Sequence, residues 1–189
     1  MKKAELLFTF IIALGIIFRL MHWPYANEIL SLGAIFLSGL YFWFSFALLN
    51  SIKLRVAFKK ESYKSISKFL ILGAIGTGIV FSLLVIYSLF KLQFWPYGQV
   101  GLLQGLILFA AILLIVFVFY LKNRKQFLKI NYLRFIIIGF ISITLFSMST
   151  NQLVDLYYGS DPEYAEEYKT YLNDESLNKK RPTRVFKSK

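Results

Sequence analysis

The chain has 189 residues, of which 57% are hydrophobic, 19% aromatic and only 17% charged. A soluble domain of this size cannot bury so large an apolar share in one core, so the composition excludes a soluble globular protein. The chain has no cysteine, which excludes disulfides, thiolate nucleophiles and Cys-based metal sites. It has a single histidine, His22, which excludes most sites built from several histidines. The composition therefore predicts an integral membrane protein, for which we expect no metal and no cofactor.

Five apolar segments divide the chain, each close to the 20 or so residues that a helix needs to cross a bilayer. They lie at residues 6–22, 29–49, 69–90, 100–121 and 135–154. The first contains Arg19 near its end, where a long side chain can extend toward the lipid head groups. A cleaved signal peptide is the alternative for this segment, but bulky residues stand where cleavage needs small ones. The sequence predicts an all-α polytopic membrane bundle with five transmembrane helices.

These helices are expected to form two hairpins, followed by a fifth helix and a tail. The expected parts are a first hairpin, a basic loop, a second hairpin, another basic loop, a fifth helix and a polar tail, at residues 1–52, 53–68, 69–121, 122–134, 135–154 and 155–189. In the tail, Ser160-Asp161-Pro162-Glu163 is a typical helix start. A short amphipathic helix should follow, with Tyr164, Tyr168, Tyr171 and Leu172 on a face suited to the bilayer or to a partner. The last residues are expected to form a flexible basic end.

Basic residues gather on one side of the predicted helices. Of the 15 Lys and Arg residues before Val154, 13 lie in the N-terminus and the two basic loops, and the other two are Arg19 and Lys91. By the positive-inside rule the N-terminus is cytoplasmic, and five spans place the C-terminal tail outside, whereas four spans would keep it inside. The net charge of +12 thus has a topological cause, and nucleic acid is not an expected partner.

A repeat of 72 residues relates the two hairpins. Residues 18–25, FRLMHWPY, align with residues 90–97, FKLQFWPY, with five identities. The register continues downstream, where Leu30 aligns with Leu102 and Gly33 with Gly105. Each copy contains two spans, so both have the same orientation, and both Trp-Pro-Tyr turns are expected on the outer face. The prediction is a tandem, parallel repeat of a two-helix hairpin.

The Trp-Pro-Tyr turns are the first candidate site. Proline ends one helix and can open the next, Trp and Tyr favour the membrane interface, and the preceding basic residue can contact phosphates. The expected interface anchors are Trp23, Pro24, Tyr25, Lys91, Trp95, Pro96 and Tyr97. The first turn alone adds His22 and Glu28. With Arg19 they form a candidate ion or partner site, because histidine titrates near neutral pH.

Small residues along two of the spans predict helix packing. They are Ser31, Ala34, Ser38 and Ser45 in the second span and Gly73, Ala74, Gly76 and Gly78 in the third, and they favour contact between these helices or with another subunit. Gln104, an amide inside the fourth span, is expected to bond a neighbouring helix, and the lining of a pore is the alternative. No catalytic triad, nucleotide-binding fingerprint or metal-ligand spacing occurs in the sequence, so we predict no catalytic residue and no enzyme.

The first turn and its flanking helices resemble a known family. The residues Arg19-Leu20-Met21-His22-Trp23-Pro24-Tyr25-Ala26, followed by Leu30 and Gly33, are similar to the Lys-x-Met-His-Trp-Pro-Gly-Ala motif of the gliding-motility motor subunit L family. Members of that family are inner-membrane components of type IX protein secretion systems. The resemblance covers about residues 6–50, with a degenerate second copy at about 78–121. It implies a Gram-negative inner-membrane protein in which Arg19 and His22 hold the family's basic and histidine positions.

The family also differs from this chain in one respect that bears on function. A carboxylate in its second membrane helix is implicated in proton-driven motor function, and residues 29–49 contain no acid. The resemblance therefore implies a relative that keeps the scaffold without proton coupling. We expect a non-enzymatic inner-membrane scaffold or accessory subunit that contacts lipids and other membrane proteins or its own copies. The alternatives are a small proton or solute transporter that uses Arg19, His22 and Glu28, and an enzyme acting on lipid at the polar outer turns.

Overall fold

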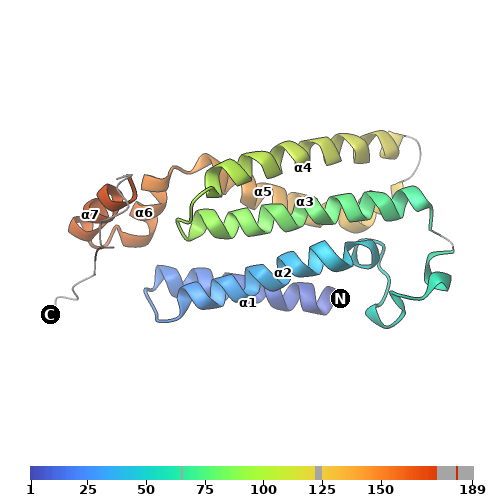
Figure 1. Ribbon diagram of the computed structural model, residues 1–189, viewed down its shortest axis with the longest axis horizontal. Helices are drawn as coiled ribbons and strands as arrows, with labels where there is room; N and C mark the ends of the chain where they lie inside the picture. The colour runs from blue at the N-terminus through green and yellow to red at the C-terminus, as the bar shows by residue number, and fades with distance from the viewer. Residues whose placement is uncertain (65, 122–124, 174–181, 183–189) are drawn as a thin grey trace. The chain divides into compact units, whose positions relative to one another are not determined.

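The computed structural model describes residues 1–64, 66–121, 125–173 and 182, with side chains for all of these except Lys60 and 119–130. Within these residues the chain is helical and contains no strand, so the all-α prediction is confirmed. The helices are α1 (Lys2–Leu20), α2 (Ala26–Leu48), α3 (Lys68–Leu92), α4 (Gly98–Leu121), α5 (Lys125–Ser147), α6 (Thr150–Tyr158) and α7 (Pro162–Asn173), with two short 3₁₀ helices, η1 (Leu54–Val56) and η2 (Lys60–Tyr63), between α2 and α3 (Figure 1). The chain forms two compact units, residues 1–146 and residues 147–189.

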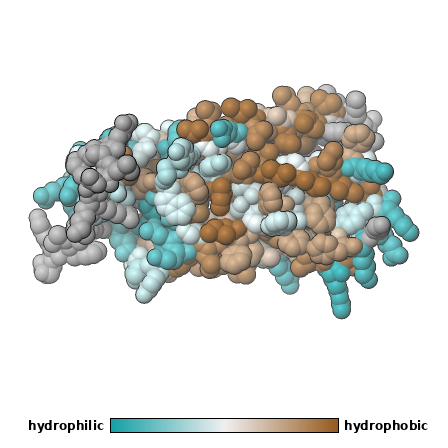
Figure 2. All heavy atoms as spheres, viewed as in Figure 1, coloured by the Kyte–Doolittle hydropathy of each residue, from teal (hydrophilic) through white to brown (hydrophobic). Residues whose placement is uncertain are grey.

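Three helices, α2, α3 and α4, are long and apolar enough to cross a membrane. The pair α5 and α6 adds a fourth if it counts as one broken span. α1 has 19 residues but carries Lys2, Lys3, Glu5 and Arg19, so its uncharged part is short. Figure 2 shows apolar side chains over much of the visible surface of these helices. The chain is therefore compatible with a multi-pass membrane protein.

Glycines set the closest approaches within each hairpin. Successive helices pack on one another, α1 on α2 and α3 on α4. A Cβ atom at Gly15 of α1 would lie 2.7 Å from the backbone nitrogen of Leu30 in α2. In the second hairpin the glycine lies on the second helix and the large residue on the first, because Gly101 of α4 faces the ring of Tyr87 in α3. Small residues at these places let two membrane helices approach closely, which is where their dispersion attraction is strongest.

The predicted serine stripe lies between α2 and α3. The hydroxyl oxygens of Ser38 and Ser82 are 2.7 Å apart, and the Gln93 side chain donates to Ser31 Oγ at 2.7 Å. Ser45, at the same helical spacing, is buried. The three serines of α2 therefore join this helix to α3, which is one of the two contacts that the sequence left open.

Of the predicted small residues of α3, Gly78 completes this contact, whereas Gly73 and Gly76 lie elsewhere. A Cβ at Gly78 would overlap Ser45 and lie 2.6 Å from the Tyr41 carbonyl oxygen. Among the described residues, a Cβ at Gly73 would meet nothing within 4 Å, and one at Gly76 would meet only Ile112 of α4 at 3.6 Å. The α3 glycines therefore face different surroundings, because each successive residue points about 100° farther around the helix.

The bounds of α5 and α6 differ from those expected. Residues 122–134 were expected to be a loop, of which 122–124 lie outside the described residues, but α5 begins at Lys125. The segment from there to Arg134 contains no Gly or Pro and several good helix formers. The helix expected over 135–154 is interrupted, because Ser149 starts α6 with a capping box. Its hydroxyl accepts from the Gln152 N–H at 3.1 Å, and its own N–H donates to the Gln152 side chain at 2.7 Å.

In the unit of residues 147–189, α7 begins at Pro162 as predicted and packs on α6. The Tyr168 side chain is buried, and its ring centroid lies 5.3 Å from that of Tyr158 in α6. The tyrosine face therefore packs within its own unit. A bond from Lys169 to Asp155 joins the same helices, and this bond and one to Glu166 within α7 raise the pKa of Lys169. The predicted basic end lies outside the described residues apart from Pro182.

The α2–α3 contact predicts opposite effects for two matched glycine variants. Gly78→Ala should destabilise the protein by about 1–3 kcal/mol, because the added methyl overpacks a contact with backbone atoms. Gly73→Ala meets nothing within 4 Å and should be neutral or stabilising by up to about 1 kcal/mol through helix propensity. Thermal unfolding in detergent measures both variants, and equal midpoints would contradict the assigned contact.

Candidate functional site

The two Trp-Pro-Tyr turns have the same backbone conformation. In the first, the Trp23 N–H donates to the Phe18 carbonyl at 2.8 Å and the His22 N–H donates to the Arg19 carbonyl at 3.2 Å, and the second turn repeats both distances. These bonds form the Schellman motif that ends many helices. His22 and Phe94 occupy its left-handed position, with φ of 55° and 58°, although that position favours glycine. Each turn therefore has a residue with a side chain at a backbone position that favours glycine.

Aromatic side chains project from both turns. Tyr25 and Tyr97 precede the following helices, also in left-handed conformations, and their side chains are exposed. The Trp23 ring lies edge-on to Phe18 at 4.9 Å, and the Trp95 ring makes the equivalent contact at 5.1 Å. Amphipathic rings in such positions suit the membrane interface, and their anchoring role stays a prediction.

The basic residue of each turn is buried and bonds an amide eight residues later. The Arg19 side chain donates from Nη1 to Asn27 Oδ1 at 2.8 Å, and the Lys91 side chain donates from Nζ to Gln99 Oε1 at 2.6 Å. Arg19 and Lys91 are only 7% and 6% exposed, which leaves little surface for the lipid phosphate they were expected to contact. In each hairpin this bond ties the end of one helix to the start of the next. We call the two bonds the hairpin clamps.

The first clamp also joins the two turns to each other. The Arg19 guanidinium carbon lies 5.4 Å from the centre of the Phe94 ring, and the Gln93 side chain donates to the Asn27 carbonyl at 3.0 Å. Arg19, one of the three residues of the predicted ion or partner site, therefore contributes to helix packing. His22 is partly buried, and Glu28 is exposed on the first turn of α2.

A buried ion pair at the other end of the helices was not anticipated. Arg134 of α5 donates two hydrogen bonds of 2.6 Å to the two carboxylate oxygens of Glu5 in α1. Tyr41 of α2 donates to the same carboxylate at 2.7 Å. Asn131 accepts from Arg134 at 2.9 Å and donates to the Leu49 carbonyl at the end of α2 at 2.9 Å. We call these residues, apart from Leu49, the polar cluster.

The cluster is shielded, since the Arg134 and Glu5 side chains are 12% and 14% exposed. Sequence reasoning counted Arg134 among the residues of a basic loop and gave Glu5 no role. One signal could have identified Glu5, because it is the only acid between Met1 and Gly15 and lies on a helix expected to enter the membrane. Its partner lies 129 residues away and could not be found by spacing.

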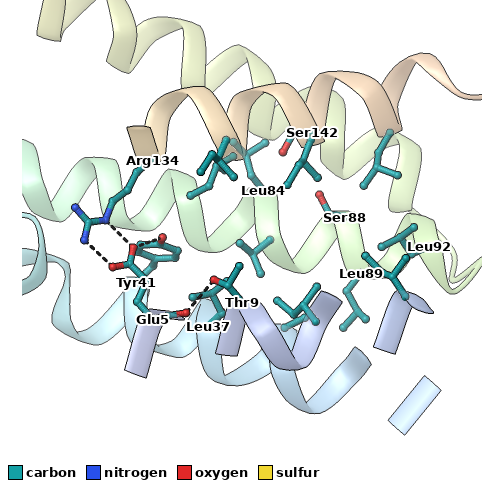
Figure 3. Close-up of a pocket in the computed structure, with 18 of the residues that line it drawn as sticks. Glu5, Thr9, Leu37, Tyr41, Leu84, Ser88, Leu89, Leu92, Arg134 and Ser142 are labelled. Carbon is teal, nitrogen blue, oxygen red and sulfur yellow. Dashed lines mark hydrogen bonds and ion pairs between the residues drawn. The ribbon is translucent and has the colours of Figure 1, made fainter. Parts of the chain in front are cut away.

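Glu5, Tyr41 and Arg134 of the polar cluster line one end of a partly open cavity of about 420 Å³. Figure 3 shows Glu5, Tyr41 and Arg134 together at this end, with Leu89 and Leu92 at the other and Ser88 and Ser142 along the walls. Apolar side chains from α1, α2, α3 and α5 supply most of the lining. A mostly apolar cavity with a few convergent polar groups is the usual form of a small-molecule site.

The cavity walls also reach the outer surface of the helices. Leu6 of α1 and Ile137 and Ile141 of α5 line the cavity and are 72%, 44% and 49% exposed. The cavity therefore borders the medium around α1 and α5. A full helix, about 10 Å across with its side chains, is too large for this volume, whereas an aliphatic chain or a small apolar solute fits.

The ion pair predicts a large loss of stability when one partner is neutralised. Glu5→Gln should cost about 3–5 kcal/mol, because it leaves the Arg134 charge buried without its counter-charge. Glu28→Gln is the matched control, and it should change stability by less than about 0.5 kcal/mol because that side chain is exposed. Denaturation in mixed micelles measures both variants. The double variant Glu5→Gln/Arg134→Gln should lose less than the two single losses added together, and strict additivity would contradict the pair.

The polar cluster, the hairpin clamps and the cavity are the features from which a function can be argued. Comparisons with protein-family models, with curated proteins and with solved structures found no match to this chain. The site must therefore be interpreted from its own geometry and chemistry.

Proposed function

We propose that the chain is a non-enzymatic multi-pass protein of the bacterial inner membrane, acting as a scaffold or accessory subunit of a membrane complex. In this proposal the complex resembles the gliding and type IX secretion motor, because the Trp-Pro-Tyr turn and its flanking residues resemble the motor subunit L family. The only acid of α2 is Glu28 on its exposed first turn, and residues 29–49 contain none, so in this proposal the chain has no proton coupling of its own.

The observation that carries the proposal is the pair of hairpin clamps. Arg19 to Asn27 and Lys91 to Gln99 are equivalent bonds at positions 72 residues apart. This equivalence supports a tandem hairpin repeat. It also supports a structural role for the basic residues, since each one is buried and committed to an amide. Groups held in this way stiffen a helix pair, which suits a protein that presents fixed helices to partners.

The proposal includes five spans, namely α1, α2, α3, α4 and the broken pair α5–α6. The charges of α1 lie at its ends or have partners, because Arg19 is clamped and Glu5 is paired with Arg134. Basic residues then place the N-terminus in the cytoplasm, both Trp-Pro-Tyr turns outside and the C-terminal tail in the periplasm. Membrane lipids surround the apolar faces, and other inner-membrane proteins are the partners.

Affinity purification from native membranes after gentle crosslinking tests the scaffold role. Mass spectrometry of the eluate should identify subunits of one membrane complex, with secretion-motor components among them. An unrelated polytopic protein carrying the same tag is the control for non-specific capture. An eluate that contains only this chain, or only what the control captures, would contradict the proposal.

A second candidate function is transport, and the cavity is the observation that favours it. The cavity contains a carboxylate, Glu5, and borders the surroundings of α1 and α5. The residues first considered for transport, Arg19, His22 and Glu28, lie at the opposite ends of α1 and α2 from Glu5 and Tyr41. A transporter would therefore combine the cavity with a second polar region at the turns.

Proton flux into reconstituted vesicles distinguishes the two functions. The scaffold proposal expects no pH-dependent flux above that of protein-free vesicles. Flux that falls in His22→Ala, or in Ser142→Leu, which would narrow the cavity, would favour the transporter instead. Each variant must keep its unfolding midpoint for the comparison to count.

A further inference from the structure

Gln104 is a polar side chain that the packing of these helices leaves without a partner. It lies on α4, six residues after Gly98 and thus about 9 Å along the helix axis. Its side chain is exposed, and within the described part of the chain no hydrogen bond involves its amide. An amide surrounded by hydrocarbon has no water to bond. Because the described part of the chain supplies no partner for Gln104, we look for one on another molecule.

The surface around Gln104 is a continuous seam on one side of α4. On the other side, about 140° around the helix from Gln104, the buried Phe109 ring packs against Phe81 of α3. The seam residues alternate in steps of three and four, the spacing of a heptad repeat, and all of them are exposed. They are Val100, Gln104, Ile107, Ala111, Leu114 and Val118, which we call the α4 seam.

Of the three clearly apolar helices, α4 is also the one least buried by the rest of the chain. In its most apolar stretch 22% of residues are buried inside the chain, compared with 44% in α2 and 39% in α3. Lipid covers an apolar helix face as well as another protein does, so exposure alone does not indicate a partner. The Gln104 amide does indicate a partner, because lipid tails cannot form hydrogen bonds with it.

We infer that the α4 seam binds the α4 seam of a second copy of this chain, with the two Gln104 side chains bonding each other. A glutamine amide carries both donors and an acceptor, so two copies related by a twofold axis along the membrane normal satisfy each other reciprocally. Both copies insert with the same orientation, which puts the two amides at the same depth. Ala111, one heptad along the seam, is small enough for close approach.

The first hairpin supplies an internal comparison. Leu32 precedes Gln104 by 72 residues and is 53% exposed on α2. The corresponding face of α2 therefore offers lipid an apolar side chain, and it has no unmet amide at this position. A single polar residue at one heptad position fixes the register of paired helices. Gln104 gives α4 that residue, and α2 lacks it.

Single cysteines test the pairing, because the chain has none of its own. Ala111 and Ala110 are adjacent, both exposed, and about 100° apart around the helix. In vesicles of phosphatidylethanolamine and phosphatidylglycerol at a low protein-to-lipid ratio, oxidation should give disulfide-linked dimers from Ala111→Cys and few from Ala110→Cys. Equal yields from the two variants, or no dimer from Ala111→Cys, would overturn the inference.

Gln104→Leu in the Ala111→Cys background tests the role of the amide. It should lower the association constant by at least about threefold, the factor that corresponds to one average interhelical hydrogen bond in a membrane. Leu32→Ala in the same background is the control and should leave the dimer yield unchanged. An unchanged yield with Gln104→Leu would overturn the inference, and so would Ala111→Cys crosslinking to a different protein in native membranes. These outcomes are separate from the scaffold test, because they concern only copies of this chain.

Discussion

A polar group in hydrocarbon has no water to bond, so each polar side chain on a membrane helix must find a partner or leave the apolar layer. Residues 1–146 meet this constraint mainly through bonds between helices. Ser38 bonds Ser82 between α2 and α3, and Glu5 bonds Arg134 between α1 and α5. The apolar residues supply most of the contact area, but these few polar groups determine which helices can touch.

The need to pair buried polar groups also explains why the turns beside the hairpin clamps adopt a strained backbone. His22 and Phe94 adopt left-handed conformations that cost a residue other than glycine roughly 1–2 kcal/mol. This conformation places Arg19 in the first turn and Lys91 in the second where each side chain bonds an amide at the start of the next helix. A buried cation without such a partner would cost more than the strained turn. The turn conformation and the clamp therefore depend on each other.

Much of this arrangement follows from local sequence patterns. The Trp-Pro-Tyr turns, the serine stripe and the start of α7 at Pro162 could all be located by spacing and proline chemistry, because each depends on neighbours within a few residues. The Glu5–Arg134 pair could not, since it joins residues 129 apart in sequence and depends on where α5 lies. The break before α6 was missed because the capping box at Ser149 outweighs the apolar length of the segment. Gly78 was one of several equivalent glycines until the α2–α3 contact singled it out.

The central claim of this account is that two clamped hairpins repeat in the same orientation, with both turns on the outer face of the inner membrane. Thiol labelling of Tyr25→Cys and Tyr97→Cys tests it most directly, since these side chains are 73% and 76% exposed. In intact spheroplasts a membrane-impermeant maleimide should label both variants, and Ser51→Cys should be labelled only after the membrane is opened. Labelling of Tyr25→Cys and Tyr97→Cys from opposite faces, or of Ser51→Cys in intact spheroplasts, would contradict the account.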